Sequence, residues 1–217
     1  MSFMREFHAN SKLVKGLNAT FIVLIPKIEN PIDLKDFKPI SLISSLYKIL
    51  TKVLANRLQT VMADLINENQ SAFVGGRQIF DGILVLNEVV DAVRKSKQES
   101  FILKVDFKEA YDCVNWDFLD NMMEKSGFGE RWRKWIMEYL GSASISILVN
   151  GSPTEEFKSE QGLRQGDPLS PFLFLLVAQG FHRLMSKAVE KGIIEGVGIG
   201  RGISLYCIYS SQTTLLS

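Results

Sequence analysis

Residues 101–116 read FILKVDFKEAYDCVNW, and this stretch is the part of the sequence that indicates the fold most directly. It begins as an apolar run interrupted only by Lys104, which predicts a buried strand, and the run ends at a carboxylate, Asp106. Tyr111 and a second acid, Asp112, follow closely. A carboxylate and backbone carbonyls at the rim of a sheet supply the oxygen ligands that Mg²⁺ takes in proteins. The alternative is structural: Asp106 only ends a strand, and Asp112 caps a turn.

Composition places the chain among globular proteins. Of its 217 residues, 46% are hydrophobic and 23% are charged, which excludes a disordered chain. The formal net charge is +1, so the chain as a whole has no basic excess. Lys and Arg outnumber Asp and Glu by 13 to 9 in residues 1–98, and the ratio reverses to 12 to 15 in residues 99–217. A basic first part beside an acidic second part suits a polyanion-binding lobe next to a metal-binding one.

Targeting signals are missing from the sequence. The two cysteines, Cys113 and Cys207, form no CxxC motif and no disulfide framework, as in reduced compartments. The segment MSFMREFHANSKLVKGL lacks the apolar core of a secretory signal. The longest strongly apolar stretch, residues 171–178, is far shorter than the ~20 residues of a membrane span. We therefore expect an intracellular protein, nuclear or cytoplasmic, with no signal peptide and no membrane partner.

The first half of the chain predicts one strand and two helices. Residues 18–25, NATFIVLI, are β-branched and apolar, as in a strand. A helix capped by Ser41 or Ser44 should run to about Ile66, because apolar residues recur there at a spacing of three to four. Its predicted apolar face comprises Leu46, Ile49, Leu50, Val53, Leu54, Leu58 and Val61. Residues 80–95 predict a second helix whose last turn is basic, as the helix dipole favours.

The second half predicts helices and a hairpin. Asn115 is placed to cap a helix that begins at Trp116. Residues 131–140 predict another helix, whose aromatic side chains we interpret as core and not as a platform for stacking bases. Residues 144–149 alternate as in a strand, and Asn150-Gly151 is typical of a type I′ turn that leads to a returning strand over residues 155–159.

A loop punctuated by Gly and Pro, QGLRQGDPLSP over residues 161–171, precedes the last helix. Ser170 would cap this helix, Pro171 would take its first position, and it would end near Gly192. Strands, helices and a hairpin in this order favour an α+β fold over a regular βαβ alternation.

Four blocks of the sequence carry a resemblance to one protein family: LIPKIENPIDLKDFKPISLISSLYKILTKVLANRL (24–58), QSAFVGGRQIFDGILV (70–85), VDFKEAYDCVNWDFL (105–119) and QGLRQGDPLSPFLF (161–174). In this order and spacing they resemble the reverse transcriptase of non-LTR (LINE-type) retrotransposons, most closely the plant elements. The resemblance extends over about residues 15–205.

The resemblance implies an architecture and a set of partners. It implies an α+β right-hand polymerase, with fingers in residues 1–100, a partial palm in residues 101–217, and the thumb absent. The implied partners are an RNA template, a DNA primer and deoxynucleotides, and the implied cofactor is Mg²⁺.

The resemblance also implies roles around the central strand. Asp106 corresponds to the first catalytic, metal-binding aspartate, and the Phe107 carbonyl is a further metal ligand. Tyr111 corresponds to the steric gate. Its ring would occupy the space that a ribose 2′-hydroxyl needs, so that deoxynucleotides are preferred.

Nucleotide-binding residues are implied elsewhere in the chain. Gln165, followed by Gly166, would contact the incoming nucleotide and the template, and Lys27 and Lys38 would reach the triphosphate. Arginine is usual in the family at the position of Lys38, and lysine keeps the charge but loses the bidentate fork.

The resemblance fails near the end of the sequence. Family members carry a Phe/Tyr-Ala-Asp-Asp hairpin after the QGDPLSP loop, whereas residues 203–217 read ISLYCIYSSQTTLLS, and no acid follows Glu195. With suitable synonymous codons, the frame one base earlier would encode His-Ile-Phe-Phe-Ala-Asp-Asp-Thr-Leu. We therefore expect a frame slip between about Gly202 and Cys207 that leaves an out-of-frame tail. The alternative is a diverged tail of no special origin.

These observations give one principal function and two alternatives. The first is an RNA-directed DNA polymerase domain that uses two-metal nucleotidyl transfer, in an inactive copy, since Ser210, Ser211 and Gln212 cannot replace charged metal ligands. The alternatives are a non-catalytic nucleic-acid-binding remnant and a non-functional pseudogene product. An incomplete palm is also expected to leave the hairpin of residues 144–159 and the Asp106 strand short of a partner strand and a covering thumb, which favours aggregation.

Overall fold

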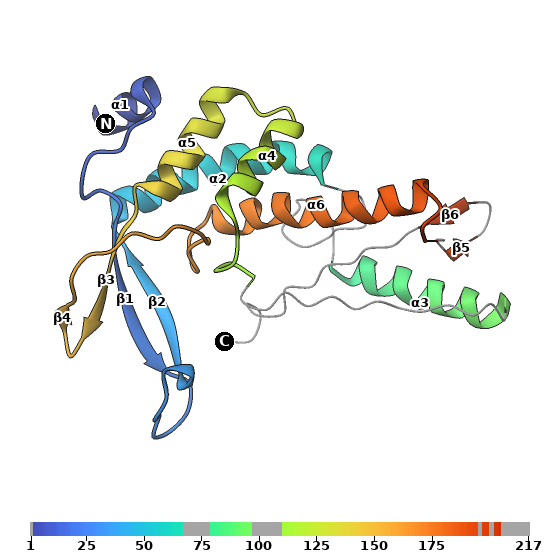
Figure 1. Ribbon diagram of the computed structural model, residues 1–217, viewed down its shortest axis with the longest axis horizontal. Helices are drawn as coiled ribbons and strands as arrows, with labels where there is room; N and C mark the ends of the chain where they lie inside the picture. Colours follow the sequence, from blue (N-terminus) through green and yellow to red (C-terminus); the bar gives the residue numbers. More distant parts are fainter. Residues whose placement is uncertain (1, 67–78, 97–109, 195–196, 200–201, 205–217) are drawn as a thin grey trace.

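Six α-helices, one 3-10 helix and six strands make up the part of the chain that the computed structural model describes, which is residues 2–66, 79–96, 110–194, 197–199 and 202–204 (Figure 1). In chain order they are α1 (Ser2–Asn10), β1 (Ala19–Pro26), η1 (Leu34–Asp36), β2 (Phe37–Ile43), α2 (Ser45–Leu65), α3 (Ile79–Ser96), α4 (Trp116–Lys125), α5 (Glu130–Gly141), β3 (Ser144–Val149), β4 (Ser152–Pro153), α6 (Ser170–Glu190), β5 (Val197–Ile199) and β6 (Gly202–Ser204). The mixture of helices with a small sheet agrees with the predicted α+β class.

The larger sheet has the strand order β2-β1-β3-β4. β1 pairs antiparallel with β2 and parallel with β3, from Ala19 opposite Ser144 to Val23 opposite Leu148. The expectation that the hairpin beginning at Ser144 lacks a partner strand is therefore wrong, because β1 supplies one. β2 was not predicted as a strand, since Lys38 and Pro39 interrupt its apolar pattern. Proline is tolerated here because β2 lies at the edge of the sheet.

The hairpin after β3 has the predicted turn, but its returning strand differs from the predicted one. Asn150 and Gly151 both have positive φ, 50° and 81°, as a type I′ turn requires. The returning strand is only Ser152–Pro153, and the predicted strand over residues 155–159 is reduced to one bridge between Ile145 and Phe157. Thr154 forms two hydrogen bonds with Ile147: its main-chain N–H donates to the Ile147 carbonyl at 2.9 Å, and its hydroxyl accepts from the Ile147 N–H at 3.0 Å.

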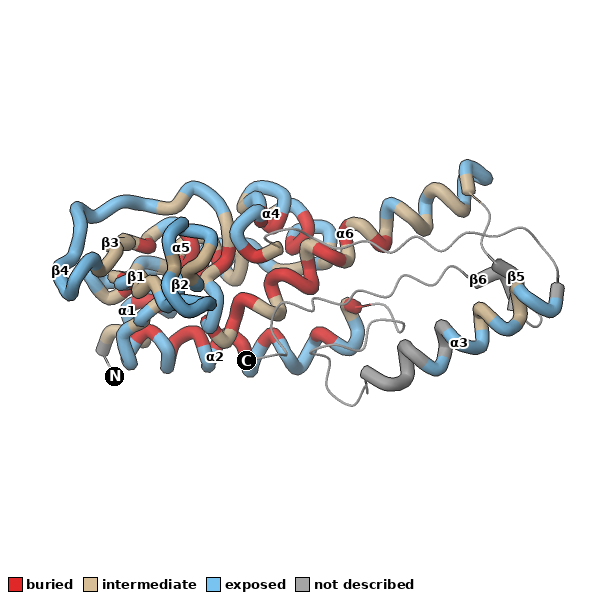
Figure 2. The backbone as a smooth tube through the Cα atoms, turned by 90° about the horizontal axis from the view of Figure 1, so that it is seen from below, coloured by how far each residue is buried: buried red, intermediate tan, exposed pale blue. Residues whose placement is uncertain are grey.

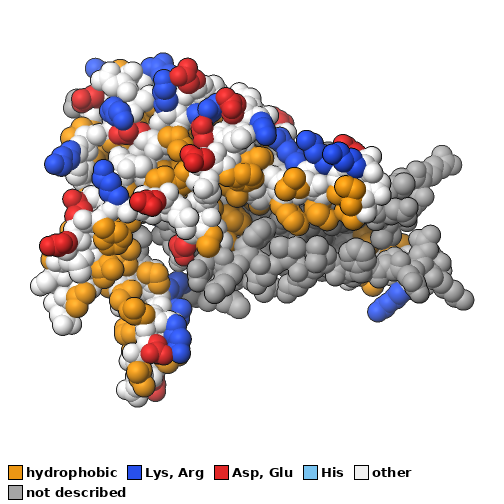
Figure 3. Space-filling model, viewed as in Figure 1, with side chains coloured by type: hydrophobic (Ala, Val, Ile, Leu, Met, Phe, Trp, Pro, Cys, Tyr) orange, Lys and Arg blue, Asp and Glu red, His pale blue; other side chains and the backbone are white. Residues whose placement is uncertain are grey.

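The sheet has one apolar face that remains exposed. Register places Phe21 opposite Leu42 and Val23 opposite Ile40 on this face, and Phe21, Leu42 and Ile40 are all exposed. Figure 3 shows apolar side chains gathered over β1 and β2. Residues on the opposite face, Ile22 among them, line the cavity described below.

α2 begins and ends as predicted, but it buries a different face. Ser44 is its N-cap and accepts a hydrogen bond from the Tyr47 N–H at 3.3 Å. The buried residues are Tyr47, Leu50, Thr51, Leu54, Ala55, Leu58 and Met62. The predicted face is wrong at Leu46, Ile49, Val53 and Val61, which are exposed. Relative to the predicted face, the helix is rotated so that Tyr47 points into the core. There the ring of Tyr47 stacks on that of Tyr139 of α5, with centroids 5.7 Å apart.

The hydrophobic core lies among α2, α4, α5 and α6. In both Figure 1 and Figure 2 the sheet projects from one end of this helical layer, and α3 lies with β5 and β6 toward the other end. α4 and α5 are joined by Arg133, whose Nε and Nη2 donate to both oxygens of Asp120 at 2.9 and 2.8 Å. Trp135, Ile136 and Tyr139 of α5 are buried, which confirms that its aromatic residues belong to the core.

Two further helix starts were predicted, and one of them is wrong. Asn115 caps α4 by accepting from the Phe118 N–H at 2.8 Å, as predicted. At α6 the N-cap is Leu169 and not Ser170, although Pro171 lies in the first turn as expected. No side chain in the described part of the chain caps α6, but the Asp167 carboxylate accepts a hydrogen bond from the Leu169 N–H at 2.9 Å and so fixes the turn just before the helix. Ser170 is buried instead, with its hydroxyl 3.5 Å from that of Tyr139.

The helix over residues 80–95 is confirmed as α3, whose last turn carries Arg94 and Lys95. The predicted border between fingers and palm, near residue 100, falls outside the described residues and stays a prediction. None of the helices in the described ranges is long and apolar enough to cross a bilayer.

Replacing Ser44 by Ala removes the N-cap of α2 and also the hydrogen bond that its hydroxyl donates to the Leu17 carbonyl. We expect S44A to lower the free energy of unfolding by about 1 kcal/mol, which thermal denaturation detects as a melting temperature a few degrees lower. The matched control is Ser45→Ala, an exposed serine one position later that does not cap the helix. Equal melting temperatures for the two variants would contradict the capping role.

Candidate functional site

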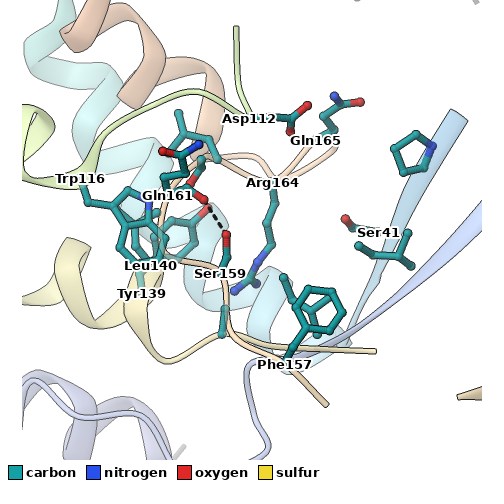
Figure 4. Close-up of a pocket in the computed structure, with 16 residues that line it drawn as sticks. Ser41, Asp112, Trp116, Tyr139, Leu140, Phe157, Ser159, Gln161, Arg164 and Gln165 are labelled. Atoms are coloured by element: carbon teal, nitrogen blue, oxygen red, sulfur yellow. Dashed lines mark hydrogen bonds between the residues drawn. The ribbon is translucent and has the colours of Figure 1, made fainter. Parts of the chain in front are cut away.

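The loop of residues 161–167 is held against the turn of residues 110–114. The Gly162 N–H donates to the Val114 carbonyl at 2.8 Å, and the Leu163 N–H donates to the Tyr111 carbonyl at 2.7 Å. The indole N–H of Trp116, at the start of α4, donates to the Gly162 carbonyl at 2.8 Å. These three hydrogen bonds, all accepted by main-chain carbonyls, place Gln165 beside Asp112 at one end of a cavity (Figure 4).

Gly162 is required at this contact. Its φ is +90°, and an added Cβ would lie 2.8 Å from the main-chain oxygen of Asp112. The left-handed conformation favours glycine in any case, but the approach to Asp112 excludes every other residue unless the turn moves. Gly166, in the same loop, has a similar φ of +85°, but nothing lies within 4 Å of its added Cβ.

The cavity, of about 390 Å³, separates the sheet from this loop. Ile22 and Pro39 form an apolar wall on the sheet side, and Arg164 and Gln165 form a polar wall on the loop side. Of the described residues that line it, only Asp112 and Arg164 are charged. The cavity therefore combines an apolar surface with side chains that can form hydrogen bonds.

Asn18 fixes the sheet wall of the cavity relative to α5. This buried residue, at the entry to β1, donates from Nδ2 to the Tyr139 carbonyl at 2.9 Å and to the Ser142 hydroxyl at 2.8 Å. The start of the sheet is thereby tied to the end of α5, and the orientation of the sheet wall follows from that tie.

Arg164 was not predicted as a site residue. Its guanidinium carbon lies 4.8 Å from the ring centroid of Tyr47 and 5.8 Å from that of Tyr139. Asp167, in the same loop, is buried, and burial raises the pKa of its carboxyl, although the Leu169 N–H and the Arg164 charge oppose that shift. Burial also raises the pKa of Tyr47 well above its ordinary value. No sequence pattern identifies Arg164, because the two tyrosines that hold it come from distant parts of the chain.

The cavity contains only part of the predicted set of residues. Gln165 lines it, but Tyr111 does not: the Tyr111 side chain is 9% exposed, and its ring lies 5.4 Å from that of Phe174 of α6. Burial raises the pKa of the Tyr111 hydroxyl. Gly166 is exposed in the loop next to Gln165 and is not one of the lining residues.

Lys27 and Lys38 lie at the far end of the β1–β2 pair. Lys38 is opposite Ile25, and the Lys27 main-chain N–H donates to the Asp36 carbonyl at 2.7 Å. Both lysines are exposed, and neither lines the cavity. The Lys27 ammonium donates to the Lys35 carbonyl at 3.2 Å.

The predicted metal site cannot be assembled from the described residues. Asp106 and Phe107 lie outside them, as does nearly all of the predicted out-of-frame tail. Within the described ranges no group of three or more His, Cys, Asp or Glu is placed to hold a metal ion, and Asp112 is the only carboxylate that lines the cavity. One carboxylate does not provide the ligands that a pair of Mg²⁺ ions needs, so the described lining of the cavity does not fit such a pair.

Comparisons with known proteins agree on one family. Residues 25–207 match the family described as reverse transcriptase (RNA-dependent DNA polymerase). The chain is 31% identical over 192 residues to the transposon TX1 uncharacterized 149 kDa protein of Xenopus laevis, which covers 88% of this chain and 15% of that protein. It is 32% identical over 159 residues to a retrovirus-related Pol polyprotein from type-1 retrotransposable element R2 of Popillia japonica, covering 70% of this chain and 21% of that polyprotein.

A third relative is the Pol polyprotein from type-2 retrotransposable element R2DM of Drosophila melanogaster, 25% identical over 195 residues. That match covers 90% of this chain and 18% of the relative. The chain thus spans only 15% to 21% of the length of these three curated relatives.

Gly162→Ala and Gly166→Ala separate steric contact from backbone strain. Both substitutions place alanine at a positive φ, but only G162A drives a Cβ into the Asp112 main chain. We expect G162A to destabilise the protein by about 1–3 kcal/mol more than G166A, the usual cost of overpacking. Urea denaturation of both variants measures the difference, and equal unfolding free energies would contradict the close approach.

Proposed function

Because the chain belongs to the reverse transcriptase (RNA-dependent DNA polymerase) family, we propose that it is the fingers region and part of the palm of a non-LTR retrotransposon reverse transcriptase. Residues 1–100 would be the fingers and residues 101–217 the partial palm. Its proposed partners are an RNA template, a DNA primer and deoxynucleotides, in the nucleus or cytoplasm.

One observation carries the nucleic-acid-binding part of this proposal. The cavity between the sheet and the 161–167 loop brings Gln165, the proposed nucleotide and template contact, together with an arginine and an apolar sheet face. A nucleotide unit likewise has an apolar base face and a polar, anionic backbone. Such a surface can accept one unit of a strand, with base faces against apolar side chains and polar groups against the loop.

The remaining site residues would act around this cavity. Lys27 and Lys38, exposed at the end of the β1–β2 pair, can reach toward a triphosphate without losing a buried contact. Lysine at position 38 would hold the phosphate as a point charge and not through a fork. Tyr111 remains the proposed steric gate, although its ring packs against Phe174 and does not line this cavity.

We further propose that this chain does not polymerise DNA. Nucleotidyl transfer is an in-line attack of a 3′-hydroxyl on the α-phosphate, and in the family two metal ions about 3.5–4 Å apart support it. Several carboxylates must converge to hold ions that close. Asp106 supplies one, but residues 203–217, where the family carries Ala-Asp-Asp, contain no acid. We also propose the frame slip between about Gly202 and Cys207 that would account for this lack of acids.

A non-catalytic nucleic-acid-binding protein is the second candidate function. It follows from the same cavity and from the excess of Lys and Arg in residues 1–98, 13 against 9 Asp and Glu. It requires no metal site, so it is the function that the described residues can perform alone.

Two assays on one purified chain separate these functions. With an RNA template, a DNA primer, Mg²⁺ and deoxynucleotides, we expect no extension above that of the Asp106→Asn variant. With the same template–primer, we expect binding whose affinity falls linearly with the logarithm of salt concentration, since phosphate contacts release counterions.

Each assay has a contradicting result. Extension that D106N abolishes would overturn the proposed inactivity and would show that metal ligands are recruited from elsewhere. Absence of template–primer binding at low salt, by a chain that unfolds cooperatively, would overturn nucleic-acid binding itself.

A further inference from the structure

Arg164 is held rigidly on the cavity wall by aromatic rings. Its guanidinium lies over the ring of Tyr47 from α2 and near that of Tyr139 from α5, and both tyrosines are almost fully buried. The two rings stack nearly parallel, at an interplanar angle of 10°. Figure 4 shows the Arg164 side chain extending from the loop along the cavity, away from Gln165. The guanidinium therefore has its position set before any ligand arrives.

The hydrogen-bonding capacity of Arg164 is not used within the described part of the chain. A guanidinium carries five N–H donors in a planar fork, and none of them donates to a residue that the structure describes, the buried Nη1 included. No carboxylate among the described residues lies within 4.0 Å of it to form an ion pair. An unused donor in a partly buried site costs free energy until an acceptor arrives.

Two acids are the candidate internal partners, and neither satisfies Arg164. The Asp167 carboxylate attracts the guanidinium only at longer range and accepts a hydrogen bond from the Leu169 N–H instead. Asp112, the other charged lining residue, lies beside Gln165 at the opposite end of the cavity from the guanidinium (Figure 4). An arginine stacked on aromatic rings with its fork unpaired suits a planar or phosphate acceptor supplied from outside.

We propose that Arg164 is a phosphate-binding residue that contacts the sugar-phosphate backbone of a nucleic-acid strand in this cavity. The inference rests on the proposed nucleic-acid binding and adds the residue that would anchor the strand. Ser41 and Gln161, on opposite walls, can add neutral hydrogen bonds to the same strand. Phe157, which is 45% exposed, offers an apolar surface to the sugar or base beside the phosphate.

The salt dependence of binding tests this role. Each phosphate contact contributes about 0.7–0.9 to the slope of log affinity against log salt. We expect Arg164→Gln to lower that slope by roughly one such contribution and to weaken template–primer binding about tenfold or more. Arg164→Lys should retain the slope, because lysine still neutralises one phosphate. The matched control is Lys187→Gln, which removes one exposed charge on α6, away from the cavity, and should leave the slope unchanged.

A merely structural Arg164 predicts a different pattern. In that case R164Q lowers the melting temperature, but the folded variant binds with the wild-type slope, and the proposal is overturned. If the wild-type chain itself does not bind template–primer, the proposed function fails first. An unchanged slope in R164Q beside normal wild-type binding contradicts only the Arg164 assignment.

A second measurement on the wild-type chain does not require the variants to fold. An arginine-specific dicarbonyl reagent, followed by peptide mass spectrometry, reports access to Arg164. We expect modification in the free protein and protection by a single-stranded oligonucleotide, with no protection of Arg183, which lies roughly 20 Å along α6 from its start.

The other outcomes of this footprinting experiment would contradict the proposed contact between Arg164 and a nucleic-acid strand. Protection by a free deoxynucleoside triphosphate, but not by the oligonucleotide, would assign the phosphate to the nucleotide and overturn the strand contact. Equal modification with and without the oligonucleotide, or no modification in the free protein, would also overturn the proposal.

Discussion

The site depends on three hydrogen bonds that join two separate segments of the chain. Gly162 and Leu163 donate main-chain N–H groups to the turn after Ala110, and the indole of Trp116 donates back to the loop. Because main-chain carbonyls accept all three, the contact depends on backbone geometry more than on the side chains of the turn. The glycine at position 162 makes the approach possible, since a larger residue would meet the Asp112 main chain. Everything that the loop carries is positioned relative to this contact.

The cavity and its arginine follow from that arrangement. The loop leaves the turn and enters α6 through Asp167, whose carboxylate accepts the Leu169 N–H just before the helix. Between these points Arg164 reaches the stacked rings of Tyr47 and Tyr139. Asn18 ties the sheet to the end of α5 and sets the opposite wall. Helices α2, α5 and α6 and the sheet thus meet around one polar loop. A site built in this way is preorganised, because its side chains need not be ordered when a ligand binds.

Local sequence patterns predicted the elements better than their contacts. Asn115 before Trp116 and the pair Asn150-Gly151 identified a helix start and a turn, because capping and positive φ depend on a few adjacent residues. The buried face of α2 could not be predicted in the same way. Tyr47 lies on that face because its ring stacks on Tyr139, which is 92 positions away in the sequence. Ser170 was a plausible cap by composition, but burial beside Tyr139 and the reach of Asp167 decided otherwise. Gln165 came from a family resemblance, whereas Arg164 became visible only once the two tyrosines were placed around it.

The family assignment and the cavity between the sheet and the 161–167 loop support one account: a preorganised surface that we propose to bind nucleic acid without catalysis. The central claim of this account is that the 161–167 loop and the turn of residues 110–114 form one rigid unit with the core. Native-state amide hydrogen exchange at Leu163 tests this directly. We predict that this amide exchanges only through global unfolding, with the same free energy of opening as the buried α6 amide of Leu173. Exchange through a much smaller, local opening would contradict the account.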